Sequence, residues 1–172
     1  MISKKYDILT TKHSSLLGCS LIMFGVTMLA GCFNFWKKSE VATEVPKLVV
    51  INVLDASYYD DCHIKGSINI PFEQFEETVK TLPKQNKYVV YCSNYACTAA
   101  PFAVKVMLNS GFENVRLLPG GIVEWYQKQL PIEGKAELQY LQEDDQPMGD
   151  ESEDVPVVTA EQLAQELQQE QQ

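Results

Sequence analysis

The sequence predicts an α/β domain with a mainly parallel β-sheet and helices on both faces. Two observations lead to this prediction: short apolar runs alternate with helical patterns along residues 47–132, and the helical segments are about ten residues long. Connections of that kind carry the chain from one parallel strand to the next, whereas antiparallel neighbours can be joined by a tight turn. We find no internal repeat in the chain.

The first half of the predicted domain holds two strands and a helix. Residues 48–53 form a continuous, β-branched run, which is typical of a strand buried on both faces. A second short strand, 67–70, stops at Pro71. Residues 72–82 are expected to be helical, because apolar side chains recur there at helical spacing and acids lie in the early turns, where the helix dipole favours them.

The second half continues the alternation. A third strand is predicted at 88–92 and a fourth at 115–118. Residues 99–109 fit a helix between these strands, and a last helix is expected over 120–129. Two aromatic residues of these helices are expected in the core: Phe102 and Trp125.

The charge of the chain disfavours nucleic-acid binding, and its distribution separates a globular domain from a tail. The 172 residues hold 14 Lys and Arg against 23 Asp and Glu, a formal net charge of −9. We therefore expect no nucleic-acid partner, because binding one requires a surface that neutralises phosphates. Twelve acids and one base lie from Glu133 onward. Hence residues 47–132 are predicted to be the globular domain, and 133–172 an acidic, mostly disordered tail.

One segment of the tail, 159–170, has a helical pattern. Thr159 and Gln162 form a capping-box pair, and the apolar residues that follow share one face. The segment is either a helix for a protein partner or a solvated, marginal helix. Its short length and the acids near its C-terminal end favour the second interpretation.

The N-terminus has the order of an export signal. Lysines precede an apolar run, 16–33, that contains the sequence LAGC at 29–32. This ending resembles the lipobox of bacterial lipoproteins, in which cleavage precedes a cysteine that then carries lipid. The resemblance implies a signal peptide over 1–31, a lipidated Cys32 and a tether over 32–46. The alternative is an uncleaved membrane helix, because about 18 apolar residues can span a bilayer.

Both interpretations place the domain outside the cytoplasm on a membrane anchor. Phe33 stands where an inner-membrane retention signal would have Asp. By analogy this favours a lipid anchor in the outer membrane, with the domain facing the periplasm.

Cys92 is the candidate reactive residue. It ends the predicted third strand, and the loop that follows leads into the helix 99–109. In open α/β sheets, ligands bind beyond the carboxyl ends of the strands, where loop N–H groups and a helix N-terminus converge. A thiolate placed there would be stabilised and could act as a nucleophile. From the spacing alone, a buried structural cysteine is an equally good interpretation.

Four ordered blocks of the domain resemble a rhodanese domain. Residues 50–53 (VINV) match its first strand, and 59–71 (YDDCHIKGSINIP) match its signature around a Gly-His-Ile-x-Gly motif, in which Cys62 replaces the first Gly. Residues 89–93 (VVYCS) match the strand that enters the active-site loop. The closing signature is matched by residues 110–125. The resemblance implies a parallel sheet of about five strands and an activity as a sulfurtransferase.

In such a domain, Cys92 would be the catalytic residue that carries sulfur as a persulfide. The resemblance implies that the active-site loop consists of Ser93, Asn94, Tyr95, Ala96, Cys97 and Thr98. The implied partners are a small-molecule or protein-bound persulfide donor and a thiol or cyanide acceptor. No cofactor is expected. The spacing of Cys62, His63, Cys92 and Cys97 fits no metal motif, so no metal is expected either, and His63 is expected to be structural.

The loop departs from the family pattern at Cys97. Family members usually carry an arginine at this position, which holds an anionic donor such as thiosulfate, and Arg116 is the only arginine in this chain. Thiosulfate is therefore disfavoured as a donor. Cys97 has three interpretations: a resolving thiol that pairs with Cys92, a sulfur relay, or a filler of the arginine position. A Cα–Cα distance above about 7 Å would eliminate the first.

The leading functional prediction is an exported, membrane-anchored sulfurtransferase that uses Cys92. One alternative is a non-catalytic rhodanese-fold module that binds a partner. Another is a thiol–disulfide redox protein that uses Cys92 and Cys97.

Overall fold

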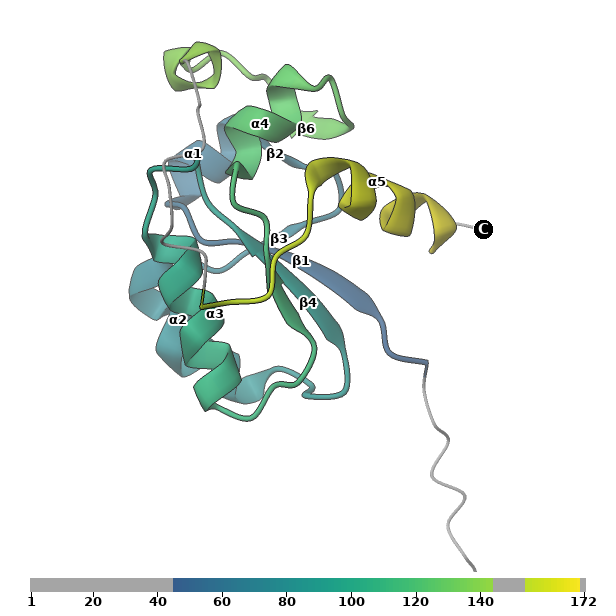
Figure 1. Cartoon of the computed structure of the whole chain (residues 1–172). Coiled ribbons are helices and arrows are strands. Elements are labelled where there is room, and N and C mark those ends of the chain that lie inside the picture. Colours follow the sequence, from purple (N-terminus) through teal and green to yellow (C-terminus); the bar gives the residue numbers. More distant parts are fainter. Residues whose placement is uncertain (1–44, 144–153, 171–172) are drawn as a thin grey trace, which may run out of the picture. The chain divides into compact units, whose positions relative to one another are not determined.

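The computed structural model describes residues 45–143 and 154–170. Its main sheet has four parallel strands in the order β3-β1-β4-β5 (Figure 1). The strands are β1 (Leu48–Asn52), β3 (Ile68–Asn69), β4 (Lys87–Tyr91) and β5 (Val115–Leu117). The predicted α/β fold with a mainly parallel sheet is confirmed, with four strands in place of about five.

The two central strands, β1 and β4, explain why the sequence forms this sheet. They pair in register from Leu48 opposite Lys87 to Asn52 opposite Tyr91. The β-branched pair Ile51 and Val90 is fully buried, because helices cover both faces of the sheet. The loop after β4 begins at the carboxyl edge of these central strands.

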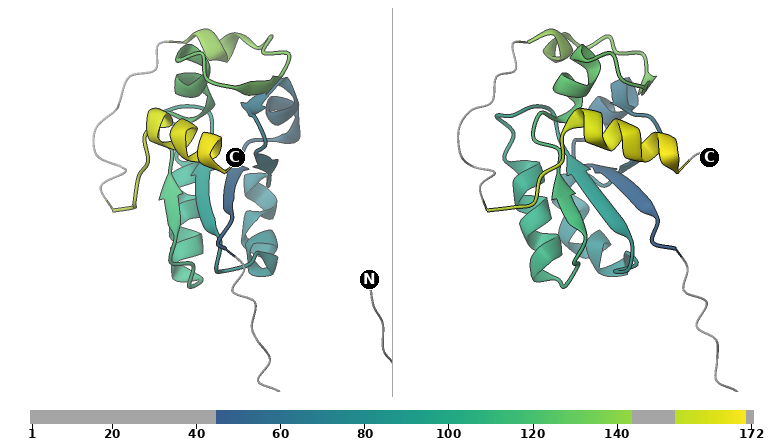
Figure 2. Two further views of the ribbon diagram at one scale, coloured as in Figure 1. Left: turned by 90° about the vertical axis from the view of Figure 1, so that its right-hand side faces the viewer. Right: turned by 45° about the vertical axis from the view of Figure 1, so that its right-hand side comes forward.

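Helices pack on both sides of the sheet, as expected (Figures 1 and 2). One apolar cluster joins the sheet to α2 (Phe72–Thr78) and α3 (Ala99–Asn109). A second cluster joins the opposite face to α4 (Gly121–Gln127) and α5 (Ala160–Gln169). The α-helix predicted over 72–82 ends at Thr78 in the structure, because the chain tightens there into a 3-10 turn, η1, at Val79–Thr81.

A second, two-stranded sheet was not predicted from the sequence. It pairs β2 (Cys62–Ile64) with β6 (Ile132–Gly134) in antiparallel register. The short helix α1 (Ala56–Asp61) precedes β2, and a 3-10 turn, η2 (Gln139–Gln142), follows β6. The folded domain thus extends beyond residue 132.

The tail differs from the expectation of a mostly disordered segment. Residues 154–170 lie against the domain, and the predicted helix is present as α5, with the capping box of Thr159 and Gln162. The Leu117 N–H donates to the Pro156 carbonyl at 2.8 Å, and the Val158 N–H donates to the Leu117 carbonyl at 2.9 Å. These bonds cover the outer edge of β5, an edge that would otherwise expose unpaired backbone groups.

Apolar and ionic contacts both attach α5. Leu163 is fully buried in the cluster that holds Trp125. The guanidinium of Arg116 donates to both carboxylate oxygens of Glu166, at 2.8 and 2.6 Å. This bidentate hydrogen bonding lowers the pKa of Glu166 and raises that of Arg116. A protein partner for the tail would therefore meet the exposed, acidic face of α5, because the domain occupies its apolar face.

The predicted export signal and Cys32 lie outside the described residues. Within residues 45–143 and 154–170, no helix is long and apolar enough to cross a membrane.

We predict that α5 contributes to the stability of the domain. Leu163→Ala should lower the free energy of unfolding by about 2–5 kcal/mol, because it leaves a cavity in a closed apolar cluster. Gln165→Ala is the matched control, since Gln165 lies in the same helix with its side chain exposed. Urea denaturation of both variants measures the difference. Equal, small changes in the two variants would mean that α5 is not packed on the domain.

Candidate active site at the end of β4

Cys92 lies directly after β4, at the carboxyl edge of the sheet. It is 2% exposed and belongs to the apolar cluster between the sheet and α3, together with Ala100 and Ala103. The predicted position of Cys92 at the end of a buried strand is therefore correct.

The start of α4 holds the backbone of Cys92. The Ile122 N–H donates to the Cys92 carbonyl at 3.0 Å, and the Val123 N–H donates to the Ser93 carbonyl at 2.9 Å. The first N–H groups of a helix have no partner within the helix, so the strand end acts as the cap of α4. The two elements thereby fix each other.

Gly121 makes this close approach possible. Its φ is +57°, a left-handed conformation that favours glycine. A Cβ at this position would overlap the Cys92 carbonyl oxygen and lie 2.6 Å from the carbonyl carbon of Ser93. The sequence motif contained this glycine, but its contact with the cysteine backbone became visible only in the structure.

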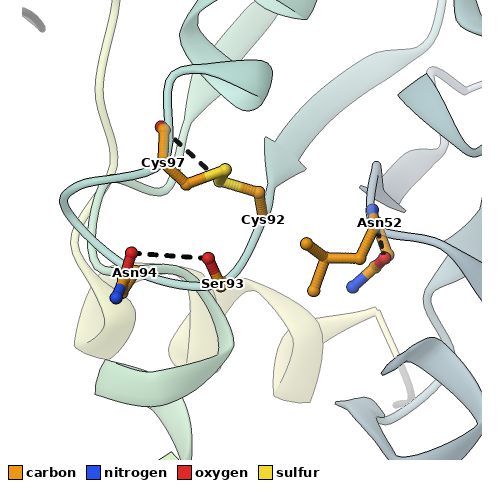
Figure 3. Close-up of a disulfide and its surroundings, with 6 residues drawn as sticks. Asn52, Cys92, Ser93, Asn94 and Cys97 are labelled. Atoms are coloured by element: carbon orange, nitrogen blue, oxygen red, sulfur yellow. Dashed lines mark hydrogen bonds between the residues drawn. A yellow bond between two sulfur atoms is a disulfide. The ribbon is translucent and has the colours of Figure 1, made fainter. Parts of the chain in front are cut away.

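Cys92 and Cys97 form a disulfide bond (Figure 3). Their Cα atoms are 6.5 Å apart, which is within the limit of about 7 Å for a disulfide. The loop curls back because the Cys97 N–H donates to the Asn94 carbonyl at 3.2 Å, and the Ser93 hydroxyl donates to Oδ1 of Asn94 at 3.3 Å. When the cysteines are reduced, the Cys92 thiol can donate to the Cys97 carbonyl oxygen, 3.6 Å from its sulfur.

The two cysteines differ in their exposure. Cys92 is buried, whereas Cys97 is half-buried between the exposed residues Ala96 and Thr98. Ser93, Asn94 and Tyr95 are also half-buried. Cys97 is therefore the more solvent-accessible of the two cysteines.

An apolar groove lies beside the loop. Its volume is about 720 Å³, and it includes Thr98 and Ala99 at the start of α3. Phe102 is half exposed and stacks edge-to-face on Phe72 at 5.5 Å in this groove, so its predicted place in the core is wrong, whereas Trp125 is buried as predicted. Phe102 lies outside the buried face of α3, which Ala103 and Met107 share, whereas Trp125 is among the buried residues of α4.

The electrostatics around the loop disfavour anions. Three carboxylates of α2 line the groove: Glu73, Glu76 and Glu77. None of the six side chains between Cys92 and Ala99 is cationic, and Arg116 is bound to Glu166. Any anionic group at Cys92 would therefore depend on uncharged donors of the loop, namely backbone N–H groups and polar side chains such as those of Ser93 and Thr98.

Contacts within the domain hold the segment around Cys62 and His63. Cys62 is fully buried, and burial, together with the charge of Asp61, raises the pKa of its thiol to about 11. Nδ1 of His63 lies 2.7 Å from the Tyr59 carbonyl, and its Nε2 lies 3.4 Å from Glu133. Within the part of the chain that the structure describes, no group of three His, Cys, Asp or Glu residues is placed to hold a metal ion.

We predict that Gly121→Ala disrupts the site more than Gly66→Ala does. Both glycines have a positive φ, so both substitutions add a backbone strain of about 1–2 kcal/mol. A Cβ at Gly121 would also collide with backbone atoms of Cys92 and Ser93, whereas a Cβ at Gly66 meets nothing within 4 Å. The free energy of unfolding should therefore fall by about 1–3 kcal/mol more in Gly121→Ala than in Gly66→Ala. Equal losses would show that α4 does not approach Cys92 this closely.

Comparisons with known proteins identify the family. A model of the rhodanese-like domain matches residues 33–128. The chain is 31% identical over 90 residues to an HTH-type transcriptional regulator of Mycobacterium tuberculosis, and the match covers 52% of this chain but only 39% of the regulator. The chain thus spans about two fifths of that curated relative.

Solved structures of two bacterial proteins resemble this one. A protein of Bacillus halodurans is 30% identical, with 62% of this chain and 74% of that chain covered and a TM-score of 0.48. A rhodanese-like domain from Anabaena sp. is also 30% identical, with 62% and 75% covered and a TM-score of 0.47. Because the family model matches more than half of the chain, this protein belongs to the rhodanese-like domain family.

Proposed function

We propose that this protein is a sulfurtransferase that carries sulfur as a persulfide on Cys92. The observation that supports the proposal is the placement of Cys92 at the carboxyl edge of the sheet, with its backbone fixed by α4 and its side chain on the α3 side. The N-terminus of α3 carries a partial positive charge, which favours a thiolate or a persulfide anion over the neutral thiol.

The proposed reaction has two steps. The Cys92 thiolate attacks the outer sulfur of a donor persulfide, R–S–SH, and the bond within the donor breaks. Cys92 then holds the persulfide, and the donor leaves as the thiolate RS⁻. In the second step an acceptor thiolate attacks the outer sulfur and departs as a new persulfide, which restores the Cys92 thiolate.

The site selects against thiosulfate as a donor. Thiosulfate carries two negative charges, and Glu73 and Glu76 line the groove beside the loop. The residue that would balance these charges in the family is replaced by Cys97. A persulfide bound to a neutral small molecule or to a protein meets less repulsion.

A second candidate function is thiol–disulfide exchange. The Cys92–Cys97 disulfide favours it, because the two cysteines already form the bond that such exchange requires. The two candidates differ in whether the reduced protein takes up sulfur.

For the location, we propose a lipid anchor on Cys32 and a domain that faces the periplasm, with the outer membrane favoured. The LAGC sequence and the preceding basic and apolar segments support this proposal. An exported setting also permits a disulfide to persist.

We expect the reduced protein to gain one sulfur atom when a persulfide with an uncharged organic group, 2-hydroxyethyl persulfide, is added in a single equivalent. Intact mass spectrometry immediately after mixing detects the gain, and cyanide should remove it. Cys92→Ser should gain no sulfur. Cys62→Ser is the matched control and should gain sulfur as the wild type does, because Cys62 is buried away from the loop. Sulfur uptake by Cys92→Ser, or neither a mass gain nor sulfide release by the wild type, would contradict the proposed role of Cys92.

A further inference from the structure

We propose that Cys97 resolves the persulfide on Cys92, so that the domain releases sulfide and is then restored by a dithiol reductant. This inference rests on the proposed persulfide at Cys92 and adds a second outcome to it. Sulfur would leave the site as sulfide within the same domain, without an external thiol to accept it.

The disulfide identifies the atom that Cys97 can reach. It joins the sulfur of Cys97 to Sγ of Cys92, which is the inner sulfur of a Cys92 persulfide. Attack on the inner sulfur closes a disulfide, whereas attack on the outer sulfur would move the persulfide to Cys97. The bond in the structure is the one that the first attack would form.

The contacts that hold the loop are present together with this bond. In the disulfide form the Cys92 and Ser93 carbonyls still accept hydrogen bonds from α4. The backbone between the two cysteines remains closed by the hydrogen bond from Cys97 to Asn94. The helix α3 begins at Ala99, two residues after Cys97, so both ends of the loop are anchored.

The resolving step balances in atoms and electrons. The Cys97 thiol loses its proton, and its sulfur forms a bond with Sγ of Cys92. The bond between Sγ and the outer sulfur breaks, and the outer sulfur leaves with the electron pair as HS⁻, accepting the proton when it becomes H₂S. The sulfur delivered by the donor is reduced, and the two cysteines are oxidised to the disulfide.

The reductant is expected to attack Cys97. Cys97 is half-buried, and Cys92 is only 2% exposed, so an incoming thiolate meets the sulfur of Cys97 first. Cys92 is then the leaving group, and as a thiolate it is stabilised near the N-terminus of α3. The resulting mixed disulfide on Cys97 is broken by the second thiol of the reductant. A dithiol therefore restores both cysteines and is itself oxidised to a disulfide.

The test uses the full-length protein with Cys19 and Cys32 replaced by serine, reduced and freed of reductant under anaerobic conditions, with one equivalent of 2-hydroxyethyl persulfide. Sulfide and intact mass are followed over time. The wild type and Cys62→Ser should release one sulfide per chain and lose the added sulfur together with two hydrogens. Cys97→Ser and Cys97→Ala should keep the added sulfur and release at least tenfold less sulfide in the same time. Dithiothreitol should then allow a second round in the wild type.

The outcomes separate the two proposals. If the wild type keeps its sulfur and releases no sulfide, the resolving role of Cys97 is overturned and the persulfide on Cys92 stands. Equal sulfide release by the wild type and both Cys97 variants overturns the resolving role as well. If neither the wild type nor the Cys97 variants take up sulfur, the proposed function itself fails. Circular dichroism of each variant tests whether the fold is retained.

Discussion

The site depends on the contact between the end of β4 and the start of α4. The carbonyls of Cys92 and Ser93 satisfy N–H groups that α4 cannot bond internally, and Gly121 leaves the space for them. This contact fixes the backbone of the cysteine while leaving the loop after it free to curl. Gly121 and Cys92, which are far apart in sequence, are therefore in direct backbone contact.

The replacement of an arginine by Cys97 changes what the loop can do. An arginine would supply a fixed positive charge for an anionic donor, whereas Cys97 supplies a thiol that bonds to Cys92. The arginine that the chain does possess, Arg116, attaches α5 through Glu166. The carboxylates beside the loop also disfavour an anionic donor, because they repel anions. Our proposal of a persulfide donor in place of thiosulfate rests on these two features.

The sequence predicted the parts of the fold that depend on local patterns. The buried strands around Ile51 and Val90 were predicted because central strands of a parallel sheet need apolar residues on both faces. The place of Cys92 followed from the strand that it ends. The pairing of β2 with β6 was missed, since Cys62 and Gly134 lie far apart in the chain and no local pattern relates them. The packing of α5 was missed because a few residues such as Leu163 carry it, within a segment whose composition is polar and acidic.

The central claim is that Cys92 and Cys97 act as a pair, and its most direct test is a peptide map. The protein is purified without reductant, its free thiols are alkylated after unfolding, and the digest is analysed by mass spectrometry. We predict one cross-linked species that joins Cys92 to Cys97, with Cys62 alkylated in full. A disulfide between Cys62 and either loop cysteine, or alkylation of all three after oxidation in air, would contradict the account.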